Sequence, residues 1–339
     1  MIYTDKTKKA MKLCFEAHEI KLADGTLLGT TDAEGKIFTD AFIDALKSYS
    51  IYAEKDGLIS FLFTSQSFPS GGDAEGKPTY IKLNASENAA TEQNISWMSS
   101  PLMAADKSVA LYATKAAYDA QGEAAFKEVI GKTTISELIG APSIDQRYAV
   151  RFNSVSITGL APETEYVFKV GDGTIMSDVK SFTTAGGNRT TNFFVIGDTQ
   201  ATDTTNTDEI TKNLMNSGIK FDFGIQTGDA VDNGGNYEHW ANIAKVFSGD
   251  FLGNTDLVHV LGNHEYYGDL TAHNAAAYYN IPGTAEDGTA PLAYSVTYGN
   301  VYVAAITYLN NAKDYEDAAS WLKADAAASN ARWKVLTMH

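Results

Sequence analysis

A chain of 339 residues is too long for one ordinary hydrophobic core, so we expect two or three domains. Apolar residues make up 44% of the chain, which allows large cores and argues against intrinsic disorder. The formal net charge of −16 argues against nucleic-acid binding through a basic patch, so an anionic substrate would need metal ions or local dipoles nearby. No apolar run of ~18 residues occurs, so the sequence predicts no membrane span.

The N-terminal quarter of the chain divides into a helix and a β-rich segment. Residues 1–18 are predicted to form a short amphipathic helix. Residues 19–75 are predicted to form a small β-rich domain and a linker, because short apolar alternations are separated by the turn sequences ADG, DAEG and KDG. This pattern is similar to the small transthyretin-like sandwiches of bacterial surface proteins. We expect an extracellular or cell-surface location, although residues 1–20 contain no apolar segment typical of a secretory signal, which taken literally would indicate the cytoplasm.

Residues 76–187 are predicted to form a second all-β unit. Tyr166 opens an expected strand with alternating apolar residues, and Leu160 lies six residues before it. This arrangement resembles the tyrosine corner of fibronectin-III-type sandwiches, in which the phenol bonds back to the backbone and fixes the crossing between two sheets. The segment 111–147 is more helical in composition, and we expect it to depart from a plain fibronectin module.

Strands, loops and helices alternate after residue 190, which predicts an α/β domain over 191–339. Helices are expected at about 207–217 and around Trp240, each between two apolar runs. Four apolar runs end on residue types that bind metals, namely Asp198; Asp229 and Asp232; Asn263, His264 and Glu265; and His339. The first three of these endings are 31 and then 34 residues apart, which fits one βαβ crossover each. These side chains should therefore collect at the carboxyl edge of one sheet.

The chemistry of these four endings indicates a metal site. A single Gly-Asp after a strand is usually a turn or a helix cap. Four such endings in order on one sheet instead indicate a shared site. Carboxylates, an amide and an imidazole supply oxygen and nitrogen ligands, which suit Mn²⁺, Fe or Zn²⁺. Cys14 is the only cysteine, so neither a thiolate zinc site nor an intrachain disulfide can form.

The series GD, GDxxD, GNHE and an apolar strand ending in His resembles the calcineurin-like metallophosphoesterases, and the preceding sandwich resembles the purple-acid-phosphatase branch. This resemblance implies a multidomain fold, with all-β sandwich domains followed by an incomplete α/β metallophosphoesterase sandwich. It implies two metal ions (Fe, Zn or Mn), with Asp198 on the first, Asp229 bridging both, and Asn263 and His339 on the second. His264 would be catalytic, since it would stay off the metals and hydrogen-bond the phosphoryl oxygens or the leaving group.

Three positions depart from the family pattern. Purple acid phosphatases carry a Tyr three residues after the bridging Asp, where Asp232 stands here, so an iron-loaded protein should not be purple; Asp232 is itself a possible metal ligand. Other members have His two residues after the first Asp, where Gln200 stands, either as a neutral ligand or as an outer hydrogen-bond donor. The family's Gly-His-x-His turn does not occur in residues 1–339, so we expect the natural chain to continue past His339.

Together these features predict a hydrolase that cleaves phosphate esters, in small molecules or polymers, by a dinuclear metal centre that activates water. The alternative is a non-catalytic cell-surface binding or adhesion protein whose phosphoesterase-like domain is inert. Soaking with Mn²⁺ and searching for ordered metal would distinguish the two.

Overall fold

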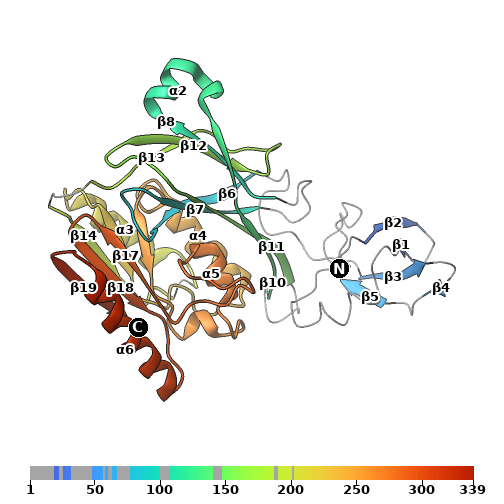
Figure 1. Ribbon diagram of the computed structural model, residues 1–339. Coiled ribbons are helices and arrows are strands. Elements are labelled where there is room, and N and C mark those ends of the chain that lie inside the picture. Colours follow the sequence, from blue (N-terminus) through green and yellow to red (C-terminus); the bar gives the residue numbers. More distant parts are fainter. Residues whose placement is uncertain are drawn as a thin grey trace. The chain divides into compact units, whose positions relative to one another are not determined.

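The computed structural model describes residues 19–22, 26–31, 48–55, 58–59, 63–66, 77–99, 107–139, 147–186, 190–200 and 202–339. The helix expected at 1–18 lies outside the described residues. Contacts within the chain define two compact units (Figure 1), of which the second consists of Lys77–Met98, Ala105–Thr134 and Phe152–His339. Among the described helices, none has the length and apolar character needed to cross a membrane.

The described residues between 19 and 66, which belong to the first unit, form an antiparallel sheet of five strands. Its order is β2-β1-β3-β4, and β5 also pairs with β3. The strands are β1 (Glu19–Leu22), β2 (Leu27–Thr30), β3 (Ser48–Lys55), β4 (Leu58–Ile59) and β5 (Phe63–Gln66). This part of the chain is β-rich, as its apolar alternation and turn sequences predict.

The region that follows contains two four-stranded sheets, with orders β10-β11-β7-β6 and β13-β12-β8-β9. Their strands are β6 (Thr79–Asn84), β7 (Gln93–Ser99), β8 (Val109–Thr114), β9 (Lys127–Ile130), β10 (Lys132–Ile139), β11 (Arg147–Ile157), β12 (Glu165–Gly171) and β13 (Lys180–Thr183). Trp97 from the first sheet and Phe168 from the second are buried in the same hydrophobic cluster. The predicted all-β sandwich is therefore confirmed.

The tyrosine corner expected at Tyr166 is also confirmed. Its hydroxyl accepts a hydrogen bond from the backbone N–H of Ala161 at 2.9 Å. The Tyr166 ring stacks on Phe182 with 5.4 Å between ring centroids. The phenol therefore ties strand β12 to the turn before it, while its ring fills the core between the sheets.

The helical composition expected for 111–147 gives only one short α-helix among the described residues of that segment. This helix, α2 (Lys115–Gln121), follows β8, and a 3₁₀ turn, η1 (Gly122–Ala125), continues it. The next residues form β9 and β10, because β9 pairs with β8 over four positions. Strand pairing thus overrides the local helical composition.

The C-terminal region is an α/β structure, as predicted. The strands β14 (Phe193–Ile196), β15 (Phe223–Gln226) and β16 (Asp256–His259) form a parallel sheet. A second sheet contains β17 (Ala293–Tyr298), β18 (Val301–Ile306) and β19 (Trp333–Met338), with β17 antiparallel and β19 parallel to β18. The helices are α3 (Thr205–Asn216), α4 (Tyr237–Phe247), α5 (His273–Tyr279) and α6 (Ala312–Ala328), with 3₁₀ turns η3 (Leu252–Asn254) and η4 (His264–Tyr266).

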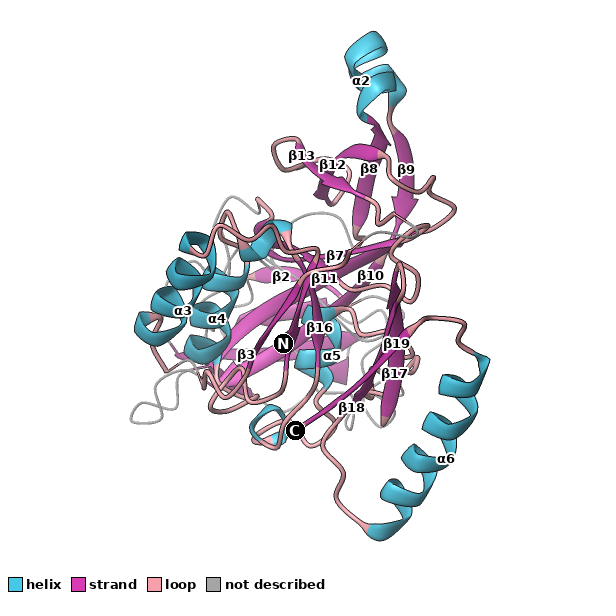
Figure 2. Ribbon diagram, turned by 90° about the vertical axis from the view of Figure 1, so that its left-hand side faces the viewer, coloured by secondary structure: helices cyan, strands magenta, loops and turns pink. Residues whose placement is uncertain are grey.

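The helices occupy different positions around these two sheets. Figure 2 shows α3 and α4 side by side and α6 against the sheet of β17, β18 and β19. Helix α4 is the helix expected around Trp240, and its Trp240, Ile243 and Phe247 are inaccessible to solvent. Each parallel strand pair is thus connected through one helix, which brings the ends of β14, β15 and β16 to one edge.

Strand β6 of the sandwich packs directly against β16 of the α/β region. The Ala85 N–H donates to the Leu257 carbonyl at 3.1 Å, next to this contact. The buried Lys82 Nζ lies 2.8 Å from His259 Nε2, and the His259 ring stacks on Tyr279 at 3.6 Å between centroids. The sandwich therefore supports the strand that precedes the GNHE sequence.

Candidate metal centre

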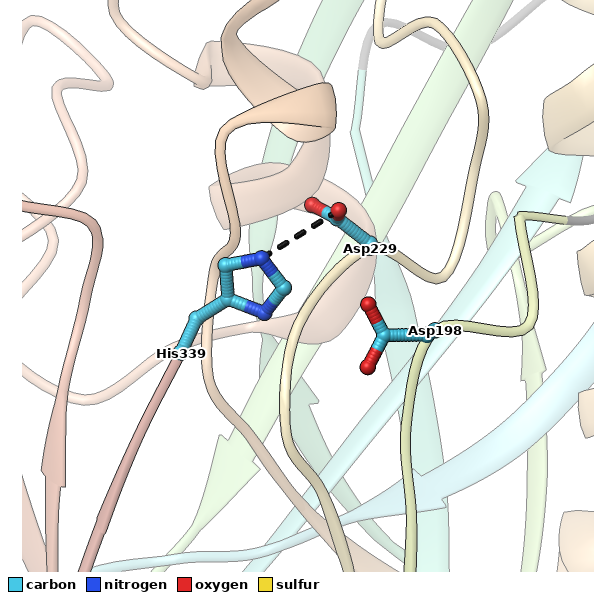
Figure 3. A group of neighbouring side chains, drawn as sticks. All are labelled: Asp198, Asp229 and His339. Atoms are coloured by element: carbon cyan, nitrogen blue, oxygen red, sulfur yellow. Dashed lines mark ion pairs between the residues drawn. The ribbon is translucent and has the colours of Figure 1, made fainter.

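The side chains that follow the strand ends meet in one place. Ligand atoms of Asp198, Asp229 and His339 lie within 4.8 Å of one another. Figure 3 shows the three side chains next to one another. Asp198 follows β14, Asp229 follows β15 and His339 follows β19. Asn263, after β16, joins them, since its Oδ1 lies 3.2 Å from His339 Nε2. The structure thus brings together the four residues that the resemblance assigns to metals. The expectation that all four follow strands of one sheet is wrong for His339, because β19 belongs to the sheet of β17 and β18 and not to that of β14, β15 and β16.

The loops that carry the two aspartates adopt unusual backbone conformations. Asp198 and Asp229 have φ values of 49° and 53°, in the left-handed region that non-glycine residues seldom adopt. Gln200, at φ 38°, shares this feature, and its N–H donates to the Asp229 carbonyl at 2.8 Å. Backbone strain of this kind persists only where surrounding contacts enforce it, and it concentrates at functional sites.

Glu265 supplies much of that enforcement. Its carboxylate is fully buried, and it accepts backbone hydrogen bonds from Gly262 at 2.8 Å, Asp229 at 3.0 Å, Ala230 at 2.7 Å and Val231 at 3.3 Å. Burial raises the pKa of Glu265 to about 7, and the hydrogen bonds from these N–H groups oppose the rise. One side chain thereby joins the loop after β15 to the loop after β16.

Hydrogen bonding fixes which nitrogen of His339 faces the other ligands. Its Nδ1 lies 3.0 Å from the carbonyl oxygen of Thr227, which can only accept, so Nδ1 carries the proton in the neutral ring. The unprotonated Nε2 then faces Asp229 Oδ2 at 3.2 Å and Asn263 Oδ1 at 3.2 Å. Three electron-pair donors converge without a proton between them, which is a donor set that fits a cation.

His264 lies beside this group with its own set of partners. Its Nδ1 donates to the Asp232 carbonyl at 2.8 Å, and its Nε2 accepts from the Gln200 amide at 3.0 Å. Its backbone N–H donates to Asp229 Oδ1 at 3.0 Å. The imidazole is therefore held next to Asp229, with 3.7 Å between Nε2 and Asp229 Oδ2.

Gln200 and Asp232, the two further candidates, both lie against His264. The geometry of Gln200 is that of an outer donor, because its amide nitrogen points to the imidazole. The Asp232 carboxylate lies 3.4 Å from His264 Nδ1 and is 44% exposed. Among the described residues, Asp232 is absent from the carboxylate and histidine group that could hold an ion.

Glu265 was expected only as one of the metal-binding residue types at the third strand ending, and Tyr267 was not singled out; the structure shows Glu265 bonded to backbone N–H groups instead. The Tyr267 hydroxyl accepts from Asn263 Nδ2 at 3.0 Å, and its ring lies 4.6 Å from that of His264. Neither residue carries a periodic or spacing signal, because each acts on neighbours that only the folded loop brings to it.

Two family models match the chain. The model described as "Purple acid Phosphatase, N-terminal domain" matches residues 78–184. The model described as "Calcineurin-like phosphoesterase" matches residues 191–339. No curated protein matches the chain.

Among solved structures, the chain is similar to one titled "Structure of PhoD", with a TM-score of 0.49 and 12% identity over 78% of this chain and 63% of that chain. It is similar to the chicken CNTN1 FN1–FN3 domains, with a TM-score of 0.22 and 15% identity over 40% of this chain and 42% of that one. It is also similar to the third fibronectin III domain of human KIAA0343 protein, with a TM-score of 0.19 and 16% identity over 38% and 99%. The chain thus spans less than two thirds of the PhoD chain.

The family matches and the donor set at the strand ends agree with the fold. An antiparallel sandwich precedes a parallel α/β region, in the same order as the two matched models. We conclude that the chain carries a purple acid phosphatase N-terminal domain followed by a calcineurin-like phosphoesterase domain.

Proposed function

We propose that this protein hydrolyses phosphate esters with a dinuclear metal centre. The observation that carries the proposal is the convergence of His339 Nε2, Asp229 Oδ2 and Asn263 Oδ1, which have no proton between them when the His339 ring is neutral. Such a cluster is repulsive by itself, and a cation at its centre turns the repulsion into attraction. Oxygen and nitrogen donors of this kind suit Mn²⁺, Zn²⁺ or Fe.

Each metal would have its own set of residues. Asp198 and Asp229 would hold the first, and Asp229, Asn263 and His339 would hold the second. Asp229 is the only one of these that is fully buried, and its two carboxylate oxygens face different neighbours: His264 N–H for Oδ1 and His339 for Oδ2. An anion in this position reduces the repulsion between two nearby cations.

The reaction would draw on both the metals and His264. When bound, two metals would activate water for in-line attack and withdraw charge from the phosphoryl oxygens. His264 is 21% exposed and would give a proton to the departing oxygen. Because Nε2 accepts from Gln200 in this structure, the imidazole must first take up a proton there, and the Gln200 amide must turn away.

Two variants separate metal binding from proton transfer. In Asp229→Asn, calorimetric titration with Mn²⁺ should show no binding, and hydrolysis of p-nitrophenyl phosphate should be lost. In His264→Ala, Mn²⁺ should still bind while kcat falls by about 10²–10⁴-fold, as expected for loss of a general acid. Asp250→Asn is a matched control, because Asp250 is exposed in a loop, and it should behave as the wild type.

Two results would contradict the roles proposed for His264 and the metal ions. If His264→Ala abolished Mn²⁺ binding, His264 would be a metal ligand instead of a proton donor. If the wild type bound Mn²⁺ but hydrolysed no phosphate monoester or diester, the inert binding protein would be the better account.

A further inference from the structure

Tyr267 is an exposed residue that contacts both a metal-ligand candidate and the catalytic candidate. It directly follows the 3₁₀ turn η4, and 48% of its surface is exposed to solvent. Its hydroxyl accepts from Asn263 Nδ2 at 3.0 Å. Its ring centroid lies 4.6 Å from that of His264, with 49° between the planes. A tyrosine this exposed contributes little to a core, so these two contacts need another explanation.

The contact with Asn263 matters because an amide binds metals through only one of its ends. The terminal torsion of an asparagine is broad, so the side chain does not by itself fix where Oδ1 points. In this structure Oδ1 faces His339 Nε2 at 3.2 Å, while Nδ2 is occupied by the Tyr267 hydroxyl. The hydrogen bond holds the amide plane, and by drawing on Nδ2 it increases the electron density on Oδ1.

The contact with His264 acts through packing. The phenol ring covers one part of the imidazole, whose two nitrogens are occupied by Asp232 and Gln200. A ring in this position restricts the imidazole plane without touching either nitrogen. Hydroxyl and ring of Tyr267 therefore act on different neighbours, and they can be removed separately.

We propose that Tyr267 is a positioning residue, which orients the Asn263 amide for the second metal through its hydroxyl and aligns His264 through its ring. This inference rests on the proposed function of the same site. Outer partners of metal ligands typically change metal affinity by 10–100-fold when they are removed. The hydroxyl should therefore control metal affinity, and the ring should control turnover at saturating metal.

The test compares Tyr267→Phe and Tyr267→Leu in the whole protein. Calorimetric titration with Mn²⁺ should show about 10-fold weaker binding at one of two sites in Tyr267→Phe, with kcat restored at saturating Mn²⁺. Tyr267→Leu should show the same loss of affinity and a kcat that stays low at saturating Mn²⁺. Tyr118→Phe is a matched control, because it removes a phenol hydroxyl from α2 in the sandwich and should change neither quantity.

Each other outcome overturns part or all of the inference. Wild-type Mn²⁺ affinity in Tyr267→Phe would show that the hydroxyl does not orient Asn263. A kcat that stays low in Tyr267→Phe at saturating Mn²⁺ would show that the hydroxyl acts on the substrate instead. If Mn²⁺ did not bind the wild type at all, the proposed function would fail together with this inference. If the wild type bound Mn²⁺ and Tyr267→Phe changed neither Mn²⁺ affinity nor kcat, this inference alone would be refuted.

Discussion

Gly262 leaves the space that the buried Asp229 carboxylate occupies, so Gly262→Ala is a sharp perturbation of the centre. A Cβ at position 262 would lie 2.1 Å from Asp229 Oδ1 and 2.7 Å from the Asp229 nitrogen. The φ of Gly262 is not positive, so an alanine there meets no backbone strain and acts by steric overlap alone. The overlap can be relieved only by moving Asp229 or the Gly262 backbone.

The magnitude follows from how tightly both groups are held. The Gly262 N–H is bound to Glu265, and Asp229 Oδ1 is bound to the His264 N–H, so relief of the overlap requires a shift of about 1 Å in an ordered loop. Metal sites tolerate ligand displacements of only ~0.2 Å. We expect Mn²⁺ affinity to fall by at least about 100-fold, and overpacking to lower the free energy of unfolding by about 1–3 kcal/mol.

Calorimetric titration with Mn²⁺ measures the affinity, and urea denaturation measures the stability. Gly249→Ala is the matched control, because its Cβ would approach a neighbour no closer than 3.2 Å and its φ is not positive either. Wild-type Mn²⁺ affinity in folded Gly262→Ala protein would refute the reasoning, since Asp229 would then have room to move without leaving the metals.

Three further predictions concern Tyr166 of the sandwich, the buried Asp256 of β16, and Gln200. Tyr166→Phe should lower the free energy of unfolding by about 0.5–1.5 kcal/mol, because the Ala161 N–H loses its acceptor, and an unchanged urea midpoint would contradict the tyrosine corner. Burial raises the pKa of Asp256 from 3.8 to about 6, so the folded state holds a proton that the unfolded state has released. Stability should therefore fall as pH rises from about 4 to 6, and Asp256 contributes at most about 3 kcal/mol to this fall. Asp256→Asn should make the slope shallower without removing it, because the raised pKa of Glu265 acts over part of the same range; an identical slope in the variant would show that Asp256 does not contribute. Gln200→Ala should leave Mn²⁺ affinity within about 3-fold of the wild type, as expected for an amide that donates to His264 instead of binding metal, and a larger loss in calorimetry would make it a ligand.

The parts of the fold that sequence reasoning predicts are those with local, repeated signals. The alternation after Tyr166 and the turn before it are enough to place a strand and its corner, because both arise within ten residues. The helix expected at 207–217 is observed as α3 at Thr205–Asn216, since helix ends shift easily by one or two residues. The ligand positions after β14, β15 and β16 follow from the geometry of parallel crossovers.

The features that the sequence does not reveal depend on contacts between distant segments. Asp198 and Asp229 adopt left-handed φ values although neither residue is a glycine, so the sequence does not indicate this conformation. Hydrogen bonds between the two loops impose it. The sequence shows Glu265 as a residue of metal-binding type at a strand ending, but only the folded loops show that it accepts hydrogen bonds from four backbone N–H groups. A lysine within a strand is normally expected at the surface, but Lys82 is buried and its Nζ contacts His259 of β16.

The central claim is that metal ions bind where the strand ends of the α/β region meet. Crystals soaked in Mn²⁺ and measured at the manganese absorption edge would test it most directly. We predict anomalous density in contact with the Asp229 carboxylate, with Asp198 on one side and Asn263 and His339 on the other. Soaked crystals with no anomalous density at Asp229, or with manganese bound only elsewhere, would contradict the account.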